Sequence, residues 1–463
     1  MKRFKKMACI ILAISMLLTI AAGCSGNSTP APENQPEGQK DAPKEAQTQD
    51  APKKQVTLKF WGGVPAEYGP QQTIDKFNEE YKDKGIQAEY VRFVNDDTGN
   101  LKLETTLLAG GEIDLYMSYF LGQLVKRSEG NMALDITPYL QKAGFDPVAE
   151  LGEGVKPYLL NGKYYSLPTK MENYYILANK NMFDKAGIPL PDSWSYDEFR
   201  DIAKKLTTGE GQNKTYGIFW NTAQEIFRAV YPVEAVLGPN FMYKAEGKAT
   251  NFDNPEFTKA VKLVSDTMLV DKSAPTHVDN VTQKLTIEGM FLSQKAAMSI
   301  GVWSIRSIKD LQKYPHDFVT AYLPMPVSDK SAAKYSIGDS TIGDLLSINP
   351  KSKNIDAAFE FMMWYTKGGM LSMTPYGRVP LYKGIDRKLV TEEYMKDGEK
   401  ILDRPSVEKF LEVKDDLAIS TITTKLPEIQ KVLNEEIEAT LTGKKDAEKG
   451  MADAKKRSDE FLK

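Results

Sequence analysis

Large aromatic side chains end several of the strands that the sequence predicts. Three of the five tryptophans, Trp61, Trp220 and Trp303, stand at the carboxyl ends of predicted strands, and Tyr119 follows another strand in the same way. Ligands of open α/β sheets bind beyond the carboxyl ends of the strands, so these rings are candidates for lining a ligand cleft. Because aromatic rings stack on the apolar faces of sugars, the spacing favours a cleft that accepts a carbohydrate.

Polar residues that could pair with sugar hydroxyls lie near the same strand ends: Glu67, Ser118, Asn221, Glu225 and Arg228. Carboxylates, amides and guanidinium groups are suitable partners for hydroxyl groups. Each of these side chains could instead be a solvated surface group. Glu225 and Arg228, three residues apart on one helical turn, could also simply pair with each other.

The other two tryptophans have structural interpretations. Trp194 precedes a predicted helix whose first turn carries a capping box, Ser195 and Glu198, and we expect the ring to pack against that helix entrance. Trp364 lies inside a long apolar helix and is predicted to be a core residue.

Several kinds of chemistry find little support. His277 and His316 lie far apart without an HExxH pattern, so no metal or other cofactor is predicted. The segment GDSTIG (338–343) is one residue too long for the G-x-S-x-G nucleophile motif. No long basic run occurs outside residues 1–23, so nucleic acid is not an expected partner. Enzymes with paired carboxylates stay open at this point, because 63 acidic residues always offer some pair.

The N-terminal residues predict export and a lipid anchor. Basic residues precede an uncharged stretch up to Gly23, so residues 1–23 are predicted to be a signal peptide. Small residues stand before Cys24, as in a bacterial lipobox, whose cysteine thiol receives a diacylglyceryl group; an ordinary signal peptide cut nearby is the alternative. Residues 24–54 have too few apolar side chains to fold and are predicted to be a disordered tether. Loss of residues 1–23 removes Cys9 and changes the formal charge from −3 to −7.

Strands alternate with helices after the tether. Gln55–Trp61 is predicted to be a strand, and the helix that follows places Ile74, Phe77 and Tyr81 on one face. The alternation predicts an α/β fold with mostly parallel sheets. About 410 residues follow the tether, more than one core usually holds, so two domains are expected.

The segment Asn161–Thr207 resembles the family 1 extracellular solute-binding proteins of ABC importers, which are relatives of maltose-binding protein. It carries an Asn-Lys pair at Asn179, a Phe-x-x-Ala-Gly turn and a Pro-x-x-Trp sequence before a helix. Further stretches resemble this family in the same order: LLAGGEIDLYM, FLSQKAAMSIGVW, SINPKSKNIDAAFEFMMWYT and YGRVPLYKG. The resemblance runs from Gln55 to Lys463.

The resemblance implies a two-lobed periplasmic-binding-protein fold of class II type, with the ligand cleft between the lobes and several hinge crossings. The N-lobe would comprise residues 55–168 and 327–372, and the C-lobe residues 169–326 and 373–463. It also implies a monomer that delivers its ligand to the transmembrane subunits of an ABC permease. Two acyl chains on Cys24 would hold it at the extracellular face of the membrane, as suits a Gram-positive cell without an outer membrane.

The resemblance also implies which segments line the cleft. By position, the residues concerned are Trp61, Glu67, Ser118, Tyr119, Glu172, Trp220, Asn221, Trp303 and Arg378. Asp339 opens a strand of the returning first-lobe segment and could accept sugar hydroxyls. The tail segment DDLAISTITTKLPEIQ carries no aromatic residue, whereas maltose-binding relatives have stacking rings there. This difference argues against a maltodextrin and leaves other oligosaccharides open.

Three functions remain at this stage. The first is a carbohydrate receptor of an importer, without enzymatic activity. The second is the same fold with another solute, such as a peptide or a polyamine. The third is a secreted enzyme that acts on polysaccharide.

Overall fold

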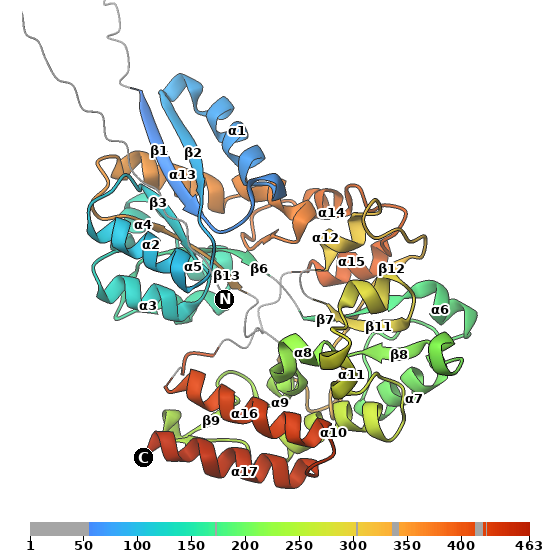
Figure 1. Ribbon diagram of the computed structural model, residues 1–463. Coiled ribbons are helices and arrows are strands. Elements are labelled where there is room, and N and C mark those ends of the chain that lie inside the picture. Colours follow the sequence, from blue (N-terminus) through green and yellow to red (C-terminus); the bar gives the residue numbers. More distant parts are fainter. Residues whose placement is uncertain (1–54, 172–173, 302–303, 336–341, 413–419, 423) are drawn as a thin grey trace, which may run out of the picture. The chain divides into compact units, whose positions relative to one another are not determined.

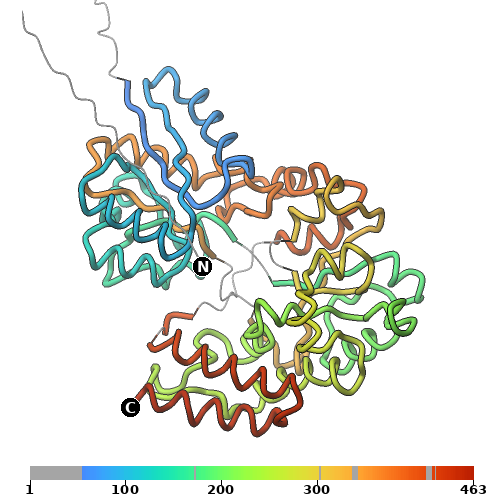
Figure 2. Tube along the Cα trace, viewed as in Figure 1, coloured from blue at the N-terminus to red at the C-terminus, as the bar shows by residue number. Residues whose placement is uncertain are grey.

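Two β-sheets organise the part of the chain that the structure describes (Figure 1). This computed structural model describes residues 55–463 except 172–173, 302–303, 336–341, 413–419 and 423. Figure 2 follows the same chain as a trace and shows that sequence-distant segments alternate between the two sheets.

The first sheet has six strands in the order β14-β6-β13-β3-β1-β2. Its strands are β1 (Val56–Gly62), β2 (Ile86–Arg92), β3 (Leu115–Ser118), β6 (Leu167–Met171), β13 (Ile342–Ile348) and β14 (Val379–Pro380). β1 pairs in parallel with β2 and β3, whereas β13 runs antiparallel to both β3 and β6. A strand from late in the sequence therefore lies in the centre of the first sheet.

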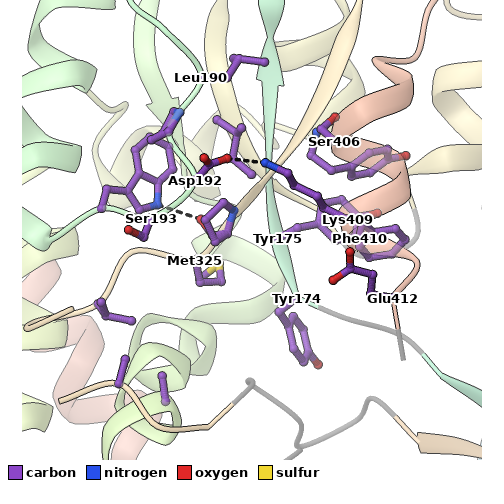
Figure 3. Close-up of a pocket in the computed structure, with 18 of the residues that line it drawn as sticks. Tyr174, Tyr175, Leu190, Asp192, Ser193, Met325, Ser406, Lys409, Phe410 and Glu412 are labelled. Atoms are coloured by element: carbon purple, nitrogen blue, oxygen red, sulfur yellow. Dashed lines mark hydrogen bonds and ion pairs between the residues drawn. The ribbon is translucent and has the colours of Figure 1, made fainter. Parts of the chain in front are cut away.

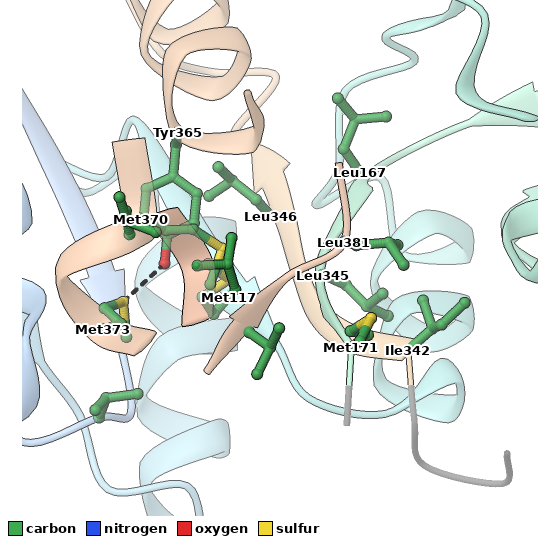
Figure 4. Packing of buried hydrophobic residues seen from close by; sticks show 14 of the residues in the cluster. Met117, Leu167, Met171, Ile342, Leu345, Leu346, Tyr365, Met370, Met373 and Leu381 are labelled. Atoms are coloured by element: carbon green, nitrogen blue, oxygen red, sulfur yellow. Dashed lines mark hydrogen bonds between the residues drawn. The ribbon is translucent and has the colours of Figure 1, made fainter. Parts of the chain in front are cut away.

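Two helices pack against the first sheet through aromatic side chains. They are α1 (Pro70–Glu80) and α13 (Ile355–Thr366). Phe361 of α13 lies with its ring centroid 5.4 Å from Phe60 of β1 and 4.8 Å from Phe77 of α1. Figure 4 shows the neighbouring part of this core, where the hydroxyl of Tyr365 donates to the sulfur of Met373 at 3.1 Å.

The second sheet has four strands in the order β12-β7-β11-β8. They are β7 (Tyr175–Asn179), β8 (Tyr216–Phe219), β11 (Ala296–Gly301) and β12 (Thr320–Pro324). Alternate residues of β7 belong to different cores: Tyr175 and Leu177 to the cluster that includes the first sheet, and Ile176 and Ala178 to a second cluster. The period-two alternation of a strand therefore divides this sheet between two packed faces.

The second core is covered by four long helices. They are α7 (Tyr196–Leu206), α10 (Pro255–Leu269), α16 (Leu426–Leu441) and α17 (Ala447–Asp459). α7 begins as predicted: Ser195 and Glu198 form a capping box, and Trp194 packs 5.0 Å from Phe199, centroid to centroid. α7 approaches β8 closely at Gly217, where a Cβ atom would lie 1.9 Å from the carbonyl oxygen of Ala203. Only glycine fits at that position without a shift of the helix.

Shorter elements complete the fold. The remaining helices are α2 (Asp97–Leu108), α3 (Leu121–Glu129), α4 (Thr137–Ala143), α5 (Pro147–Leu151), α6 (Lys180–Lys185), α8 (Thr222–Glu225), α9 (Glu234–Leu237), α11 (His277–Thr282), α12 (Ile305–Lys309), α14 (Arg387–Met395) and α15 (Arg404–Phe410). Two small antiparallel pairs join β4 (Leu159–Leu160) to β5 (Lys163–Tyr164) and β9 (Tyr243–Lys244) to β10 (Ala249–Thr250). Within the described residues, no helix is both long enough and apolar enough to cross a membrane.

The structure corrects two expectations. The sheets are mixed rather than mostly parallel, because β13 and β7 each run antiparallel to both of their neighbours. Trp364 is only partly buried, because its indole nitrogen turns outward and donates to Glu80 at 2.6 Å. The lobe boundaries stay predictions.

Candidate functional site

Trp61 and Tyr119 lie at neighbouring strand ends in the first sheet. Trp61 is the penultimate residue of β1, Tyr119 follows β3, and both half-buried rings pack against the same small apolar cluster. The ammonium group of Lys102 lies 5.9 Å from the centroid of the Trp61 ring. The backbone N–H of Gly63 donates to the Tyr119 hydroxyl at 2.5 Å. Burial raises the pKa of Tyr119 well above its usual value, so this hydroxyl stays neutral and can hydrogen-bond to a ligand.

A network of amides lies beside Tyr119. The side chain of Gln123 donates to Asn95 and to Asn100 at 3.3 Å each, and it accepts from the backbone N–H of Tyr119 at 2.8 Å. Asn100 in turn donates to Asn95 at 3.0 Å. Amides offer both donors and acceptors, which suits the hydroxyl rim of a sugar. The sequence analysis missed these residues, since the network joins side chains up to 28 positions apart.

Ser118 serves the interior of the first sheet. Its side chain is wholly buried, and its hydroxyl accepts a hydrogen bond from Arg127 at 2.7 Å. The guanidinium of Arg127 is also fully buried and contacts Glu104 at 3.3 Å and Asn100 at 2.6 Å. Burial lowers the pKa of Arg127, and Glu104 opposes that shift. Ser118 therefore helps to hold Arg127, which in turn bonds to Asn100 of the amide network. Its predicted contact with a ligand stays a prediction.

Arg378 forms a buried ion pair beneath Tyr119. Its Nε atom lies 2.7 Å from an oxygen of Asp344, and these residues are 7% and 2% exposed. Asp344 lies in β13 with a φ of 50°, which non-glycine residues rarely adopt. Such strain persists where the surroundings hold it, here the ion pair and a hydrogen bond from Thr169 to the Asp344 carbonyl at 2.8 Å. The sequence analysis missed Asp344 and chose Asp339, which lies outside the described residues, as do Glu172 and Trp303.

Trp220 follows β8, as predicted, but its ring lies in the second core. The residue is 4% exposed, and its indole N–H donates to the hydroxyl of Thr267 at 3.0 Å. Its ring centroid lies 5.6 Å from that of Phe199 on α7. In this conformation the ring packs inside the protein, so its predicted role in stacking on a ligand stays untested.

A polar cluster follows Trp220. Arg228, on the 3-10 helix η5 (Ile226–Val233), pairs with Glu225 at 2.5 Å, so the alternative in which these two residues bind each other is confirmed. The guanidinium carbon of Arg228 lies 5.4 Å from the centroid of Tyr174, and the rings of Tyr174 and Tyr231 lie 4.6 Å apart. Asn221 is 6% exposed, and its amide donates to Gln224 at 3.1 Å. The cluster combines aromatic faces with polar groups.

Glu67 lies exposed on the 3-10 helix η1 (Ala66–Tyr68). Its neighbour Tyr68 stacks with Arg306 of α12 at 4.5 Å, measured from guanidinium carbon to ring centroid. The Nε atom of Arg306 also donates to the carbonyl of Tyr376 at 3.2 Å. Glu67 therefore stands beside a rigid aromatic contact and remains accessible to solvent.

The described residues hold no group of three or more histidine, cysteine, aspartate or glutamate side chains that could bind a metal ion. A cavity of about 670 Å³ lies against β7 and β12, at the opposite edge of the second sheet from β8 (Figure 3). None of the twelve predicted ligand-binding residues lines it, although Tyr174 belongs both to its wall and to the Arg228 cluster.

Comparisons with known proteins identify what the chain is similar to. The family model described as bacterial extracellular solute-binding protein matches residues 64–367. The chain is 24% identical over 334 residues to an uncharacterized lipoprotein from the oleD 5′ region of Streptomyces antibioticus, covering 68% of this chain and 64% of that one. It is 25% identical over 215 residues to the arabinooligosaccharide-binding protein of Bacillus subtilis, covering 45% and 43%. It thus spans less than two thirds of the length of either curated relative.

A solved structure supports the fold. A sugar transporter of Rhizobium etli, in an open conformation, superposes with a TM-score of 0.70 at 21% identity, covering 87% of this chain and 99% of that one. This agreement confirms the predicted periplasmic-binding-protein fold. At this level of identity it shows the fold alone.

Proposed function

The chain belongs to the bacterial extracellular solute-binding proteins, and from this premise we propose that it captures an oligosaccharide outside the cell and delivers it to an ABC import permease. The members of this family bind solutes and are not enzymes, so the polysaccharide-acting enzyme is set aside. The arrangement that carries the proposal is Tyr119 beside the Asn95–Asn100–Gln123 network, with Trp61 packed against the same apolar cluster as Tyr119. It offers a stacking face next to groups that pair with hydroxyls.

The charges around the candidate site favour a neutral sugar. Arg127 pairs with Glu104, Arg228 with Glu225, and Arg378 with Asp344. Each of these three cations is thus already balanced by a carboxylate of the chain. An anionic ligand would have to compete with these carboxylates, whereas a neutral ligand leaves every pair intact. The relatives' names point the same way, since one binds arabinooligosaccharides and another is a sugar transporter.

Binding would proceed by hinge closure. The two lobes exchange between open and closed forms, and the ligand favours the closed form because only there do both lobes touch it. Trp61, Glu67, Tyr119 and Arg378 would act from the first lobe. Asn221, Glu225, Arg228 and Trp303 would act from the second, with Glu172, Asp339 and Ser118 completing the proposed contacts. Trp220 would support this strand end from the core, where it bonds to Thr267.

The test is a thermal-shift screen of residues 50–463 against oligosaccharides, monosaccharides, peptides and polyamines. A ligand at 100 times its dissociation constant adds about 2.7 kcal/mol to stability. We expect a shift with one class of oligosaccharide and no breakdown of that sugar. A shift with peptides or polyamines only would keep the fold and reject the sugar, and breakdown of the sugar would reject the receptor.

We also propose that Cys24 carries the lipid anchor that keeps the protein at the outer face of the cell membrane. Replacement of Cys24 by alanine should release the protein into the medium, with the same ligand affinity as before. Retention of the Cys24→Ala protein in the membrane fraction would reject the anchor.

A further inference from the structure

We propose that the cavity against β7 and β12 is a second ligand site, which binds an organic cation with an apolar body. Its volume of about 670 Å³ falls in the range of small-molecule sites. It lies at the other edge of the sheet from Trp220 and Asn221, and of the cluster around Arg228 only Tyr174 lines it.

Aromatic side chains form much of the wall. Six line the cavity: Tyr174, Tyr175, Trp194, Tyr322, Tyr335 and Phe410. Tyr175, Tyr322 and Phe410 form one packed group, with ring centroids 4.5 to 5.1 Å apart. Tyr335 is 39% exposed and rests over Gly238, and Phe410 is half-buried. The half-buried Tyr174 ring already has the guanidinium of Arg228 5.4 Å from its centroid. Aromatic faces carry negative potential and attract cations within about 6 Å.

Carboxylates outnumber ammonium groups around the same cavity. Asp192, Asp403 and Glu412 line it, against Lys330 and Lys409. Both lysines are already paired: Lys409 with Asp192 at 2.5 Å, and Lys330 with Glu198 at 2.8 Å. Within the described residues, Asp403 and Glu412 take part in no ion pair of this kind. Among its described lining residues, carboxylates therefore exceed ammonium groups by one.

The geometry places this charge beside the rings. Figure 3 shows Glu412 next to Phe410, with Tyr174 below them in this view, while Lys409 reaches from beside Phe410 to Asp192. Asp403 already caps α15, because its carboxylate accepts from the backbone N–H of Ser406 at 3.1 Å. Glu412 is thus the carboxylate available to an incoming cation, and the neighbouring rings can surround the apolar part of the ligand.

Choline, tetramethylammonium and spermidine are suitable probes, with 3,3-dimethylbutanol as the neutral isostere of choline. Calorimetry and the fluorescence of the protein, in which Trp194 lines the cavity, would measure binding. We expect saturable binding of a quaternary ammonium ion, about ten-fold tighter than that of the neutral isostere, since the isostere lacks the charge. Equal affinity for the cation and for its isostere, or no saturable binding of any probe, would overturn the proposal.

Two variants test the residues. Glu412→Gln and Tyr335→Leu, both at exposed positions, should each weaken cation binding about five-fold or more. The matched control is Glu448→Gln at an exposed position of α17, which should change nothing. A cation that loses affinity with Trp61→Ala, rather than with Glu412→Gln, would occupy the proposed oligosaccharide site instead. That result would reject both the second site and a receptor restricted to sugars, whereas loss with Glu412→Gln alone leaves the sugar proposal untouched.

Discussion

The tryptophans at the strand ends of the two sheets differ in their burial. In the first sheet Trp61 is half-buried and packs against the same apolar cluster as Tyr119, whereas Trp220 in the second sheet is 4% exposed and donates to Thr267 inside the core. Near that strand end of the second sheet, the candidate ligand contacts belong to the polar cluster around Arg228 and not to the tryptophan. The comparison teaches that a position at the end of a strand brings a residue to the right edge of a sheet but leaves the direction of its side chain open.

Replacement of Trp220 by alanine should produce the largest effect, and the effect should be on stability. Removal of a buried tryptophan costs roughly 3–5 kcal/mol of unfolding free energy, and this change also leaves the hydroxyl of Thr267 without its indole partner. Urea unfolding would measure the loss, with Trp61→Ala as the control that loses clearly less. If Trp220→Ala kept its stability and lost ligand affinity instead, the ring would belong to the binding site.

Replacement of Trp61 by alanine should lower ligand affinity and leave stability nearly unchanged. Affinity for the oligosaccharide found in the screen should fall roughly 30- to 100-fold, the loss typical of a binding hot spot, while unfolding changes little. Calorimetry on Trp61→Ala and on Trp61→Phe gives the measurement, and the phenylalanine variant should recover part of the affinity. Full affinity in the alanine variant would exclude Trp61 from the site and remove the contrast between the two sheets.

Replacement of Glu225 by glutamine should have a smaller effect, on affinity only. The side chain of Glu225 is 28% exposed, and its loss of charge leaves the guanidinium of Arg228 without its carboxylate partner. We expect affinity to change by about five-fold, the scale of one ordinary hydrogen bond, and to become dependent on salt concentration. Ligand titrations at low and high salt would measure the affinity of both proteins. Identical curves for wild type and variant would place the Arg228 cluster outside the site.

The last prediction concerns the pH dependence of stability at Lys309 of α12, the helix that also carries the Arg306 contact with Tyr68. Lys309 donates to the carbonyls of Pro375 at 3.1 Å and Tyr394 at 2.6 Å, and burial lowers its pKa from 10.5 to about 8. Between these two values the unfolded chain binds more protons at this position than the folded one, so the contribution of Lys309 to stability rises with pH.

The measurement is the difference in unfolding free energy between wild type and Lys309→Met at several pH values from 7 to 10. The comparison cancels the other groups that titrate in this range. The unfolding free energy of the wild type should rise relative to that of Lys309→Met as the pH rises above about 8. A difference that stays constant over this range would show that Lys309 titrates normally.

Local sequence signals predicted the framework well. The capping box of Ser195 and Glu198, the packing of Trp194 against Phe199, and the strand positions of Trp61, Tyr119 and Trp220 are all present. Each depends on residues close together in the chain, where spacing alone fixes which backbone groups meet. The family resemblance, spread over ordered motifs, predicted the fold that the comparisons confirm.

The candidate site was only partly predictable. Asn95, Gln123 and Asp344 were missed, and their contacts join residues 28 positions apart in one case and 34 in another. No local pattern marks an asparagine that will meet a glutamine from another helix. The φ of 50° at Asp344 likewise could not be predicted from the sequence, because it is held by the ion pair with Arg378 and not by the residue's own preference.

The sequence by itself determined the alternation of strands and helices, the two large groups of apolar side chains and the residues available at each strand end. The tertiary structure decided that β13 and β7 run antiparallel to their neighbours, that Trp220 turns inward, and that Arg378 meets Asp344. The physical reason is that hydrophobic periodicity and capping act over a few residues. The direction of a side chain depends instead on the packing and charge partners that distant segments bring to it.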